Sequence, residues 1–493
     1  MSRIDQVFQS YTRTHATRIA LQDSHDSVTY GDLGGRVDAV ARQLQQAGVR
    51  PGDRVLLVAE NSVALALTIL ATSRLRAWSA SVNARLSTRE IDNFLLHSGA
   101  RRALYFSAGS EEAARHGEAH GASLLHWEGI GAVMLGPLQS EAMTEPAAPD
   151  VAALVYTSGT TGAPKAVMLT HANLLFIGAN SRKIRALTPD DVIYGVLPLS
   201  HVYGLSALLV AALASGAALQ LVPRFDPLAM AHALQHDGVT VLHGVPAMYA
   251  KLLATSARVS APALRVAQSG GAPLSASLKA DFEACFGITL HNGYGMTEAA
   301  PSICQTRMDV PRSDCSVGPA IEGIEIRLDT LIQDVDGIGE LQVRGPNVMA
   351  GYYRAPEASV AALTADGWLH TGDLARIDAD GAVTIVGRSK ELIIRSGFNV
   401  YPVEVEQVLN AYPGIVQSAV IGRSSADNEE VLAFIEVRAD VLLDRSHLHD
   451  YLRANLSPYK MPAEIIALAS LPAAASGKIL KRELHKLASA TDE

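Results

Sequence analysis

Apolar residues recur at helical and strand spacings through the first third of the chain, which predicts alternating helices and strands. Residues 30–47 carry four aliphatic side chains at intervals of three and four, the period of a helix that buries one face. Gly48 follows and is expected to end this helix, because glycine readily adopts the backbone conformation found just past helix ends. The apolar run at 54–58 then predicts a buried strand. Ser87 and Glu90 have the spacing of a capping box and predict the start of another helix.

From residue 192 to residue 295 the alternation becomes regular. The predicted strands are 192–197, 217–222, 239–242, 264–267 and 289–291, and the clearest helix between them is 275–286. Strands that alternate with helices indicate a parallel sheet, and ligands of such sheets bind beyond the carboxyl ends of the strands. Two glycine-rich segments, 269–273 and 292–298, fall at such ends, so we expect a binding site there.

One uncharged segment, residues 204–222, is long enough to span a bilayer. Gly216 divides it into a part of helix length and a part of strand length, and Ser206 and Gln220 add polar groups. We therefore predict a buried helix followed by a buried strand, and no transmembrane segment. The N-terminal residues lack the apolar core of a signal peptide.

The remaining pattern completes an α/β fold class. After residue 316 short strands and turns predict a β-rich subdomain, and residues 107–150 are expected to be irregular and to lie on the surface. Residues 388–493 have their own helices, predicted at 403–412 and 446–456, with strands between them. We expect a large N-terminal domain of parallel sheets flanked by helices (1–387) and a small α+β C-terminal domain (388–493).

Composition narrows the class of protein. Of the 493 residues 48% are apolar and 18% are charged, which is typical of a compact soluble protein. The net charge of −9 gives no electrostatic reason to expect nucleic acid as a partner. Three cysteines form no disulfide framework and favour a reducing, cytoplasmic compartment.

The segment 156–171 has the composition of a phosphate-binding loop. Hydroxyl side chains, glycines and Lys165 follow an apolar strand, so backbone N–H groups, hydroxyls and one positive charge could surround an anion. Ala163 and Pro164 separate the last glycine from the lysine, so the segment is not a Walker A motif. Alone it is more often an ordinary loop. The two further loops at the same sheet edge favour the anion-binding interpretation.

Four other residues are candidates for chemistry, each with a plainer alternative. Glu298 could hold Mg²⁺ beside a polyphosphate or be a solvated surface group. Tyr294 could stack on a purine or belong to the core. Asp373 could accept hydrogen bonds from a ribose, although Gly-Asp is ordinary turn material. Lys478 could be catalytic or simply exposed. The chain has no HExxH motif, no zinc-type Cys/His spacing and no Gly-x-Ser-x-Gly elbow.

Taken together, five segments resemble the motifs of the adenylate-forming superfamily, which includes acyl- and aryl-CoA synthetases, peptide-synthetase adenylation domains and firefly luciferase. They occur in the family order across about residues 25–485. The segments are 156–165 (phosphate loop), 292–298 (adenine and Mg²⁺), 368–373 (ribose), 387–397 (hinge) and 476–478 (C-terminal lysine).

The resemblance implies a two-step reaction. A carboxylate attacks the α-phosphorus of Mg·ATP to give an acyl adenylate and pyrophosphate, and a thiol, usually that of coenzyme A, then displaces AMP. Positioning and charge neutralisation account for the first step. The resemblance also implies that the C-terminal domain is mobile. It would rotate about Lys390 after adenylation, withdrawing Lys478 and bringing Ser396, Gly397 and Phe398 toward a tunnel for the CoA arm.

The resemblance assigns roles to the remaining residues. The β- and γ-phosphates would be held by Thr157, Ser158, Gly159, Thr160, Thr161 and Lys165. Adenine would be framed by Gly271, Ala272, Asn292 and Tyr294, and the ribose would be bound by Asp373 and Arg388. Thr297 would contact the α-phosphate, Glu298 would hold Mg²⁺, and Lys478 would bridge the carboxylate and the α-phosphate.

The segment 198–204 resembles the acyl-pocket lining of 4-coumarate- and medium-chain-acyl-CoA ligases. His201 would gate the site and Tyr203 would line it. The further walls would be Gly270, Gly295, Met296, Ala300 and Pro301. Gly293 stands where malonate-type ligases have an arginine, and a buried second charge without a partner would be costly. We therefore expect a single-carboxylate acid with an apolar or aromatic body; coumarate-like and medium-chain fatty acids both fit.

Other functions stay open at this point. They are a stand-alone adenylating enzyme that loads a carrier-protein thiol, a malonyl-type ligase, and a nucleotide-binding protein without catalysis. Intact Glu298 and Lys478 argue against the last of these. Oxygenase activity like that of luciferase is disfavoured, because Ile394 or Arg395 occupies the position of its oxidation-step lysine. Both a monomer and a homodimer are compatible with the sequence.

Overall fold

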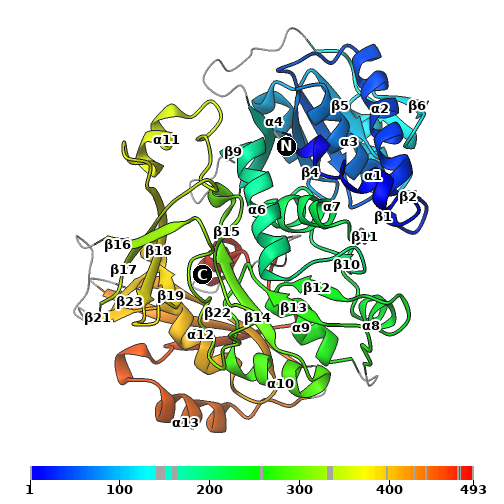
Figure 1. Ribbon diagram of the computed structural model, residues 1–493. Coiled ribbons are helices and arrows are strands. Elements are labelled where there is room, and N and C mark those ends of the chain that lie inside the picture. The colour runs from blue at the N-terminus through cyan, green and yellow to red at the C-terminus, as the bar shows by residue number, and fades with distance from the viewer. Residues whose placement is uncertain are drawn as a thin grey trace.

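The computed structural model describes residues 3–139, 150–157, 165–255, 259–329, 337–395, 398–425, 428–438, 441–474, 477 and 479–490. Two large sheets with their helices form most of the protein. In Figure 1 the first sheet, blue to cyan, lies above the second, green, and the C-terminal part lies at the lower left. One apolar core contains side chains from both sheets, among them Leu57 and Leu219, so the two layers are packed into one body.

The first sheet has seven strands in the order β6-β7-β5-β3-β4-β8-β9. They are β3 (Arg54–Ala59), β4 (Trp78–Asn83), β5 (Arg102–Tyr105), β6 (Ser123–Trp127), β7 (Gly131–Leu135), β8 (Val151–Thr157) and β9 (Lys165–Thr170). Their helices are α2 (Tyr30–Gln46), α3 (Val63–Arg74), α4 (Thr88–Ser98) and α5 (Glu111–Ala119). The predicted capping box is confirmed, because Ser87 and Glu90 each bond the other's backbone N–H.

The prediction that 107–150 is irregular is wrong for its described part. Residues there form α5, β6 and β7, and β7 pairs antiparallel with β5. The pattern of apolar residues did not predict β6, because only its last residue, Trp127, is buried. An edge strand with one buried side chain has no visible alternation of apolar and polar residues.

The second sheet has eight strands in the order β15-β14-β13-β12-β10-β11-β1-β2. They are β1 (Ile19–Gln22), β2 (Ser27–Thr29), β10 (Val192–Gly195), β11 (Ala218–Leu221), β12 (Val241–Gly244), β13 (Val266–Ser269), β14 (Leu290–Gly295) and β15 (Ser302–Gln305). The accompanying helices are η1 (Ile4–Gln6), α1 (Tyr11–Thr14), α6 (His171–Ile184), η2 (Tyr203–Val210), α7 (Ala211–Ser215), α8 (Pro227–His236), α9 (Pro246–Leu253), α10 (Ala276–Phe286) and η3 (Thr297–Ala299). β1 and β10 to β14 run parallel, as the alternation predicts.

Gly216 divides the uncharged segment as predicted. It has φ +74° at the end of α7, and a Cβ there would lie 2.7 Å from the ring of Tyr11. A larger residue would therefore be strained twice, by its backbone and by this contact. Within the described ranges, every helix is too short or too polar to cross a membrane.

The rest of the chain forms an antiparallel sheet and the C-terminal part. The sheet comprises β16 (Glu325–Asp329), β17 (Gly339–Arg344), β18 (Leu369–Ile377) and β19 (Val383–Arg388), with α11 (Pro356–Ala362) beside it. The C-terminal elements are η5 (Ser389–Glu391), β20 (Ile393–Arg395), β21 (Phe398–Val400), α12 (Pro402–Asn410), β22 (Ile415–Ser425), β23 (Asn428–Val437), α13 (Arg445–Asn455), η6 (Pro458–Lys460), β24 (Glu464–Leu468) and α14 (Lys481–Ala490). The domain boundary at 387–388 stays a prediction; it falls at the end of β19.

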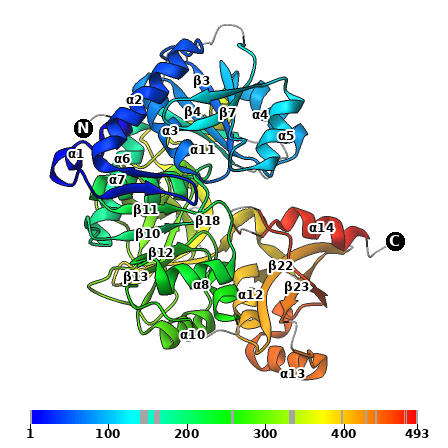
Figure 2. The ribbon, with the colours of Figure 1, turned by 90° about the vertical axis from the view of Figure 1, so that its right-hand side faces the viewer.

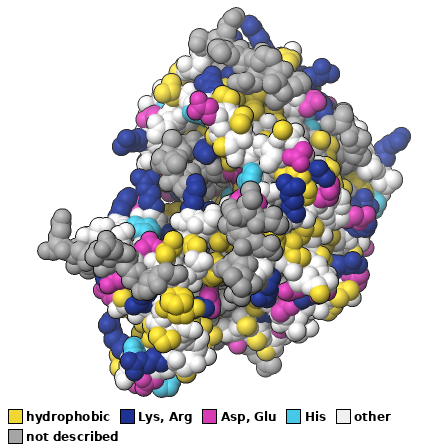
Figure 3. All heavy atoms as spheres, turned by 90° about the vertical axis from the view of Figure 1, so that its left-hand side faces the viewer, with side chains coloured by type: hydrophobic (Ala, Val, Ile, Leu, Met, Phe, Trp, Pro, Cys, Tyr) yellow, Lys and Arg dark blue, Asp and Glu magenta, His cyan; other side chains and the backbone are white. Residues whose placement is uncertain are grey.

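The C-terminal part rests against the second sheet and its helices, as Figure 2 shows. Ser277 Oγ, at the start of α10, donates a hydrogen bond to Asn410 O at 3.2 Å. Near the other end of the C-terminal part, a Cβ on Gly477 would lie 2.6 Å from Val245. The tail therefore reaches the rim of the second sheet. On the face drawn in Figure 3, basic and acidic side chains are interspersed with apolar ones.

Candidate active site

A cavity of about 2410 Å³ lies where the sheets and the C-terminal part meet. Its wall includes Lys165 from β9, Tyr294 from β14, Asp373 from β18, and Gly477 from the tail. These residues come from four of the five motifs found in the sequence. The fold thus gathers segments that are more than 300 residues apart around one space.

Three polar side chains joined through one carboxylate lie at the β14–β18–β19 side of this cavity. The Tyr294 hydroxyl donates to Asp373 Oδ2 at 2.5 Å, and Arg388 Nε lies 2.9 Å from Asp373 Oδ1. Asp373 and Arg388 are direct partners in the β18–β19 register, so the sheet itself sets their spacing. Burial and the Asp373 carboxylate raise the pKa of Tyr294 well above its ordinary value. Tyr294 therefore remains a neutral donor.

Both motifs in this network lie on strands, whereas the sequence predicted loops. Residues 292–295 continue β14 beyond its expected end, because β15 returns antiparallel and pairs with Gly293 and Gly295. Thr371 and Asp373 lie within β18, with Gly372 at φ +70° between them. The side chain of Asn292 donates to Cys315 O at 2.9 Å, so it holds the following loop in place.

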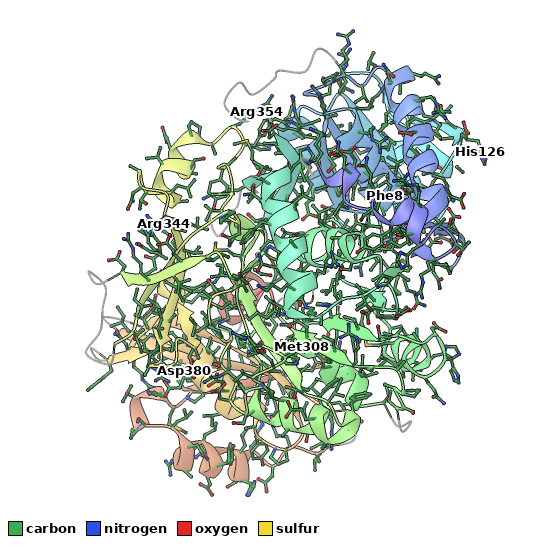
Figure 4. The ribbon with its side chains drawn as sticks, in the orientation of Figure 1. Phe8, His126, Met308, Arg344, Arg354 and Asp380 are labelled. Carbon is green, nitrogen blue, oxygen red and sulfur yellow. The ribbon has the colours of Figure 1, made fainter. Side chains whose placement is uncertain are left out.

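Three side chains meet at the β9 side of the cavity. Tyr352 donates its hydroxyl proton to Glu298 Oε1 at 2.8 Å, and Lys165 Nζ lies 4.9 Å from the centre of the Tyr352 ring. Tyr352 connects the predicted phosphate and metal residues, and sequence reasoning missed it. Its neighbour Arg354, labelled in Figure 4, donates to His97 O at 3.0 Å and ties this segment to α4.

Glu298 fits the role of a Mg²⁺ ligand. It is a carboxylate on the cavity wall, 9% exposed, and its Oε2 has no protein partner among the described residues. Mg²⁺ is usually held by one or two carboxylates together with phosphate oxygens and water. Of the predicted phosphate residues, Thr157 and Lys165 lie on the wall, and Ser158, Gly159, Thr160 and Thr161 lie outside the described residues.

The predicted acid pocket is built around Tyr203. His201 Nδ1 accepts the Tyr203 N–H at 3.2 Å, and the Tyr203 hydroxyl lies 3.2 Å from His243 Nδ1. A Cβ on Gly270 would lie 3.1 Å from the Tyr203 ring, so glycine leaves room for this ring. Of the remaining predicted walls and adenine residues, Gly271, Ala272, Gly295, Met296, Thr297 and Pro301 line the cavity, while Ala300 is fully buried and is not on the wall.

Sequence reasoning also missed polar residues at the bottom of this pocket. Arg185, Gln268 and Gln305 all contribute to the cavity wall. Arg185 directly follows α6, and its side chain is buried among residues of the second sheet. The sequence does not indicate that this arginine is buried, because an isolated arginine at the end of a helix is usually a surface residue.

The described residues of the two C-terminal motifs are partly on the cavity wall, at 387–391 and at Gly477. Lys478, Ser396 and Gly397 lie outside the described residues. Gly477, next to Lys478, lies on the cavity wall. Lys390 is exposed within η5. Its neighbour Glu391 forms an ion pair with Lys481, with 2.9 Å between Glu391 Oε2 and Lys481 Nζ. Phe398 is 55% exposed and stacks on Tyr459, with 4.7 Å between ring centroids.

Comparison with known proteins places these features in a family context. Residues 8–353 match the family model "AMP-binding enzyme" and residues 404–478 match "AMP-binding enzyme C-terminal domain". The chain is 36% identical to a feruloyl-CoA synthase from Amycolatopsis sp., over 96% of each chain. It resembles ATP-bound MatB from Rhodopseudomonas palustris (TM-score 0.84, 31% identity, 99% of each chain). It also resembles o-succinylbenzoate coenzyme A synthetase from Bacillus subtilis in complex with ATP and magnesium (TM-score 0.80, 30% identity, 98% and 99%).

Proposed function

The chain belongs to the family of AMP-binding enzymes, and on that premise we propose how its cavity performs the family's chemistry. The protein is an acid–thiol ligase that uses ATP, Mg²⁺ and coenzyme A. It joins a carboxylic acid to AMP with release of pyrophosphate, and then transfers the acyl group to the CoA thiol with release of AMP. What we add is the assignment of residues and the kind of acid.

One observation supports the assignment most directly. Tyr294, Glu298, Asp373 and Arg388 all lie on the wall of a cavity that Gly477 also borders. We assign the adenine to Tyr294 and its glycine neighbours, and the two ribose hydroxyls to Asp373 with Arg388. Because Asp373 is already held by two partners, its carboxylate is fixed in direction before the nucleotide binds. Such preorganisation lowers the entropy lost on binding.

The remaining side chains act on the phosphates and the reacting carboxylate. We assign the β- and γ-phosphates to Lys165 and the preceding loop, and the metal to Glu298, oriented by Tyr352. A bound Mg²⁺ would neutralise phosphate charge and so make the α-phosphorus easier to attack. Lys478, which follows Gly477 in the sequence, would hold the carboxylate and the α-phosphate together as negative charge develops. In the second step, Lys390 would serve as the hinge and Phe398 would approach the CoA arm.

We propose an aromatic acid as the substrate. Tyr203, Gly270 and Met296 contribute a flat apolar part to the lining of the acid pocket, which suits an aromatic body. The feruloyl-CoA synthase relative is named for an acid of this kind. A medium-chain aliphatic acid is the alternative, because an apolar wall also accepts an alkyl chain.

Release of AMP tests the function and the acid together. We expect CoA-dependent AMP formation with cinnamic-type acids to exceed that with aliphatic, benzoic or short dicarboxylic acids. Efficient turnover of aliphatic acids alone would contradict the aromatic assignment. Pyrophosphate exchange with no CoA turnover on any acid would instead indicate an enzyme that loads a carrier-protein thiol.

We also propose the cytoplasm as the compartment. The three cysteines, Cys285, Cys304 and Cys315, are all free, and unpaired thiols are typical of reducing compartments. Fractionation of the source cells with an antibody to the protein would test this. Recovery in an oxidising compartment would contradict it.

A further inference from the structure

A row of buried polar side chains crosses the second sheet next to Tyr203, and we call it the floor of the acid pocket; of its three residues, Gln268 lines the cavity itself. His243 on β12 pairs with Gln268 on β13, and Gln268 pairs with His291 on β14. Residues paired across neighbouring parallel strands point to the same face of a sheet. All three are buried, so the face beneath the pocket is polar where an apolar floor would be expected.

Arg185 lies against this floor, and its guanidinium is poorly paired. Its side chain is 2% exposed. Nη2 makes a long hydrogen bond of 3.5 Å to Gln305 Oε1, while Nε and Nη1 have no partner among the described residues. Burial lowers the pKa of Arg185. Among the described residues, the titratable side chains near it are Tyr203, Tyr249, His243 and His291, and no carboxylate is among them.

A purely structural role does not account for this arrangement. A cation near the C-terminus of α6 gains from the helix dipole, but this gain is small and is confined to the last turn. Leaving a buried donor unpaired is costly, and the cost is larger for a charged group than for a neutral one. Buried charges are normally paired for that reason. Arg185 also lies on the cavity wall, where a ligand atom could complete its hydrogen bonds.

We propose that Arg185 recognises an oxygen acceptor on the acid, at the end opposite to the reacting carboxylate. The acid would then be an aryl acid with a hydroxyl, an ether or a second acid group at its far end. Guanidinium N–H groups donate to all three kinds of oxygen, and most strongly to an anion. This inference rests on the proposed function, because it concerns the acid that the ligase activates.

The wild-type enzyme provides the first test. The efficiency kcat/KM of AMP release is measured with cinnamic, 4-hydroxycinnamic and 4-carboxycinnamic acids at saturating ATP and CoA. We expect at least one oxygenated acid to exceed cinnamic acid by at least about tenfold, the value of one hydrogen bond to a charged group. A preference for the carboxy acid identifies an anion, and a preference for the hydroxy acid identifies a neutral acceptor. Equal or better use of cinnamic acid overturns the proposal.

Substitution of Arg185 provides the second test. In Arg185→Met the preference for the oxygenated acid should fall to within about threefold, through its KM, while the efficiency with cinnamic acid is kept or rises. Arg182→Met is the matched control, because Arg182 is an exposed arginine one turn earlier in α6. An Arg185→Met enzyme that keeps the full preference overturns the proposal.

Two further measurements keep the result interpretable. If Arg185→Met does not fold, judged by its melting transition, Arg185→Lys retains the charge but not the planar pair of donors, and should lose most of the preference. Retention of the preference in Arg185→Lys counts against recognition by the guanidinium. An enzyme that activates no acid would contradict the proposed function, whereas one that activates all three acids equally would contradict only the role of Arg185.

Discussion

The two ends of the cavity differ in how completely their buried polar groups are paired. At the nucleotide end, Tyr294 and Arg388 each bond the Asp373 carboxylate, at 2.5 Å and 2.9 Å. At the acid end, Arg185 and His243 keep ring or guanidinium nitrogens without a partner among the described residues. The same nucleotide binds in every turnover, so a preorganised site, whose polar groups are already paired, suits it. The acid is the substrate that distinguishes one such ligase from another, and the donors without partners lie where the acid would bind.

This contrast has an energetic meaning. A buried donor without a partner destabilises the free protein, and a ligand that supplies an acceptor recovers that energy as affinity and selectivity. A ligand without the acceptor recovers none of it. The nucleotide end should therefore control how tightly ATP binds with any acid, and the acid end should control which acid is used.

The largest expected effect comes from Lys478, which would serve both ends. Lys478→Ala should slow adenylation by at least ~10²-fold with every acid, because one charge donor to the transition state is lost. Conversion of a supplied acyl adenylate to the thioester should survive. Pyrophosphate exchange and single-turnover thioester formation measure the two half-reactions. Equal loss of both would contradict the role of Lys478, and a loss that depended on the acid would break the division between the two ends.

Asp373 tests the nucleotide end alone. Asp373→Ala should raise the KM for ATP by roughly tenfold to a hundredfold, because the ribose loses its acceptor and Tyr294 and Arg388 lose their common partner. Asp380→Asn is the control. Asp380, labelled in Figure 4, lies between β18 and β19 and does not line the cavity; it forms an ion pair with Arg312 and accepts a hydrogen bond from the Ala382 N–H. The order of preference among acids should be the same in both variants and the wild type; a changed order would show that the two ends are coupled.

The hinge should give a smaller effect, confined to the second step. Lys390→Pro fixes one backbone dihedral within η5 and should slow thioester formation by about tenfold, or ~1.4 kcal/mol of barrier, with adenylation less affected. Stopped-flow measurement of each half-reaction provides the comparison. Unchanged CoA transfer would count against a hinge at this position.

The sequence predicted the elements in which buried residues recur at regular intervals along the chain. The parallel strands of the second sheet, the capping box at Ser87 and the break at Gly216 were all visible, because each has a local cause. The edge strand β6 was not, since one buried side chain leaves no pattern. Residues 292–295 extend a strand only because β15 returns beside them, and that pairing is not local.

The site residues also differed in how far the sequence could predict them. Motif residues such as Tyr294 and Asp373 could be found because they lie in short segments with a distinctive composition. Tyr352 and Arg185 could not, because each acts through the three-dimensional contacts of a single ordinary residue. The expectation of a single-carboxylate acid did not take account of Arg185, a buried cation on the cavity wall. Composition does not reveal which arginine folds inward.

The last prediction concerns His291 in the floor of the acid pocket, and it is about stability rather than activity. Burial, with Lys279 and Arg185 nearby, lowers the pKa of His291 to about 4, from about 6.5 in an unfolded chain. Between these values the unfolded state binds more protons, so the stability that His291 contributes above pH 6.5 is lost as the pH falls toward 4. At pH 5 the loss is about 2 kcal/mol.

His291→Gln should therefore show a smaller drop in melting temperature between pH 7 and pH 5 than the wild type. His126→Gln, at the exposed histidine labelled in Figure 4, should keep the wild-type drop. Equal drops in all three proteins would contradict the lowered pKa of His291.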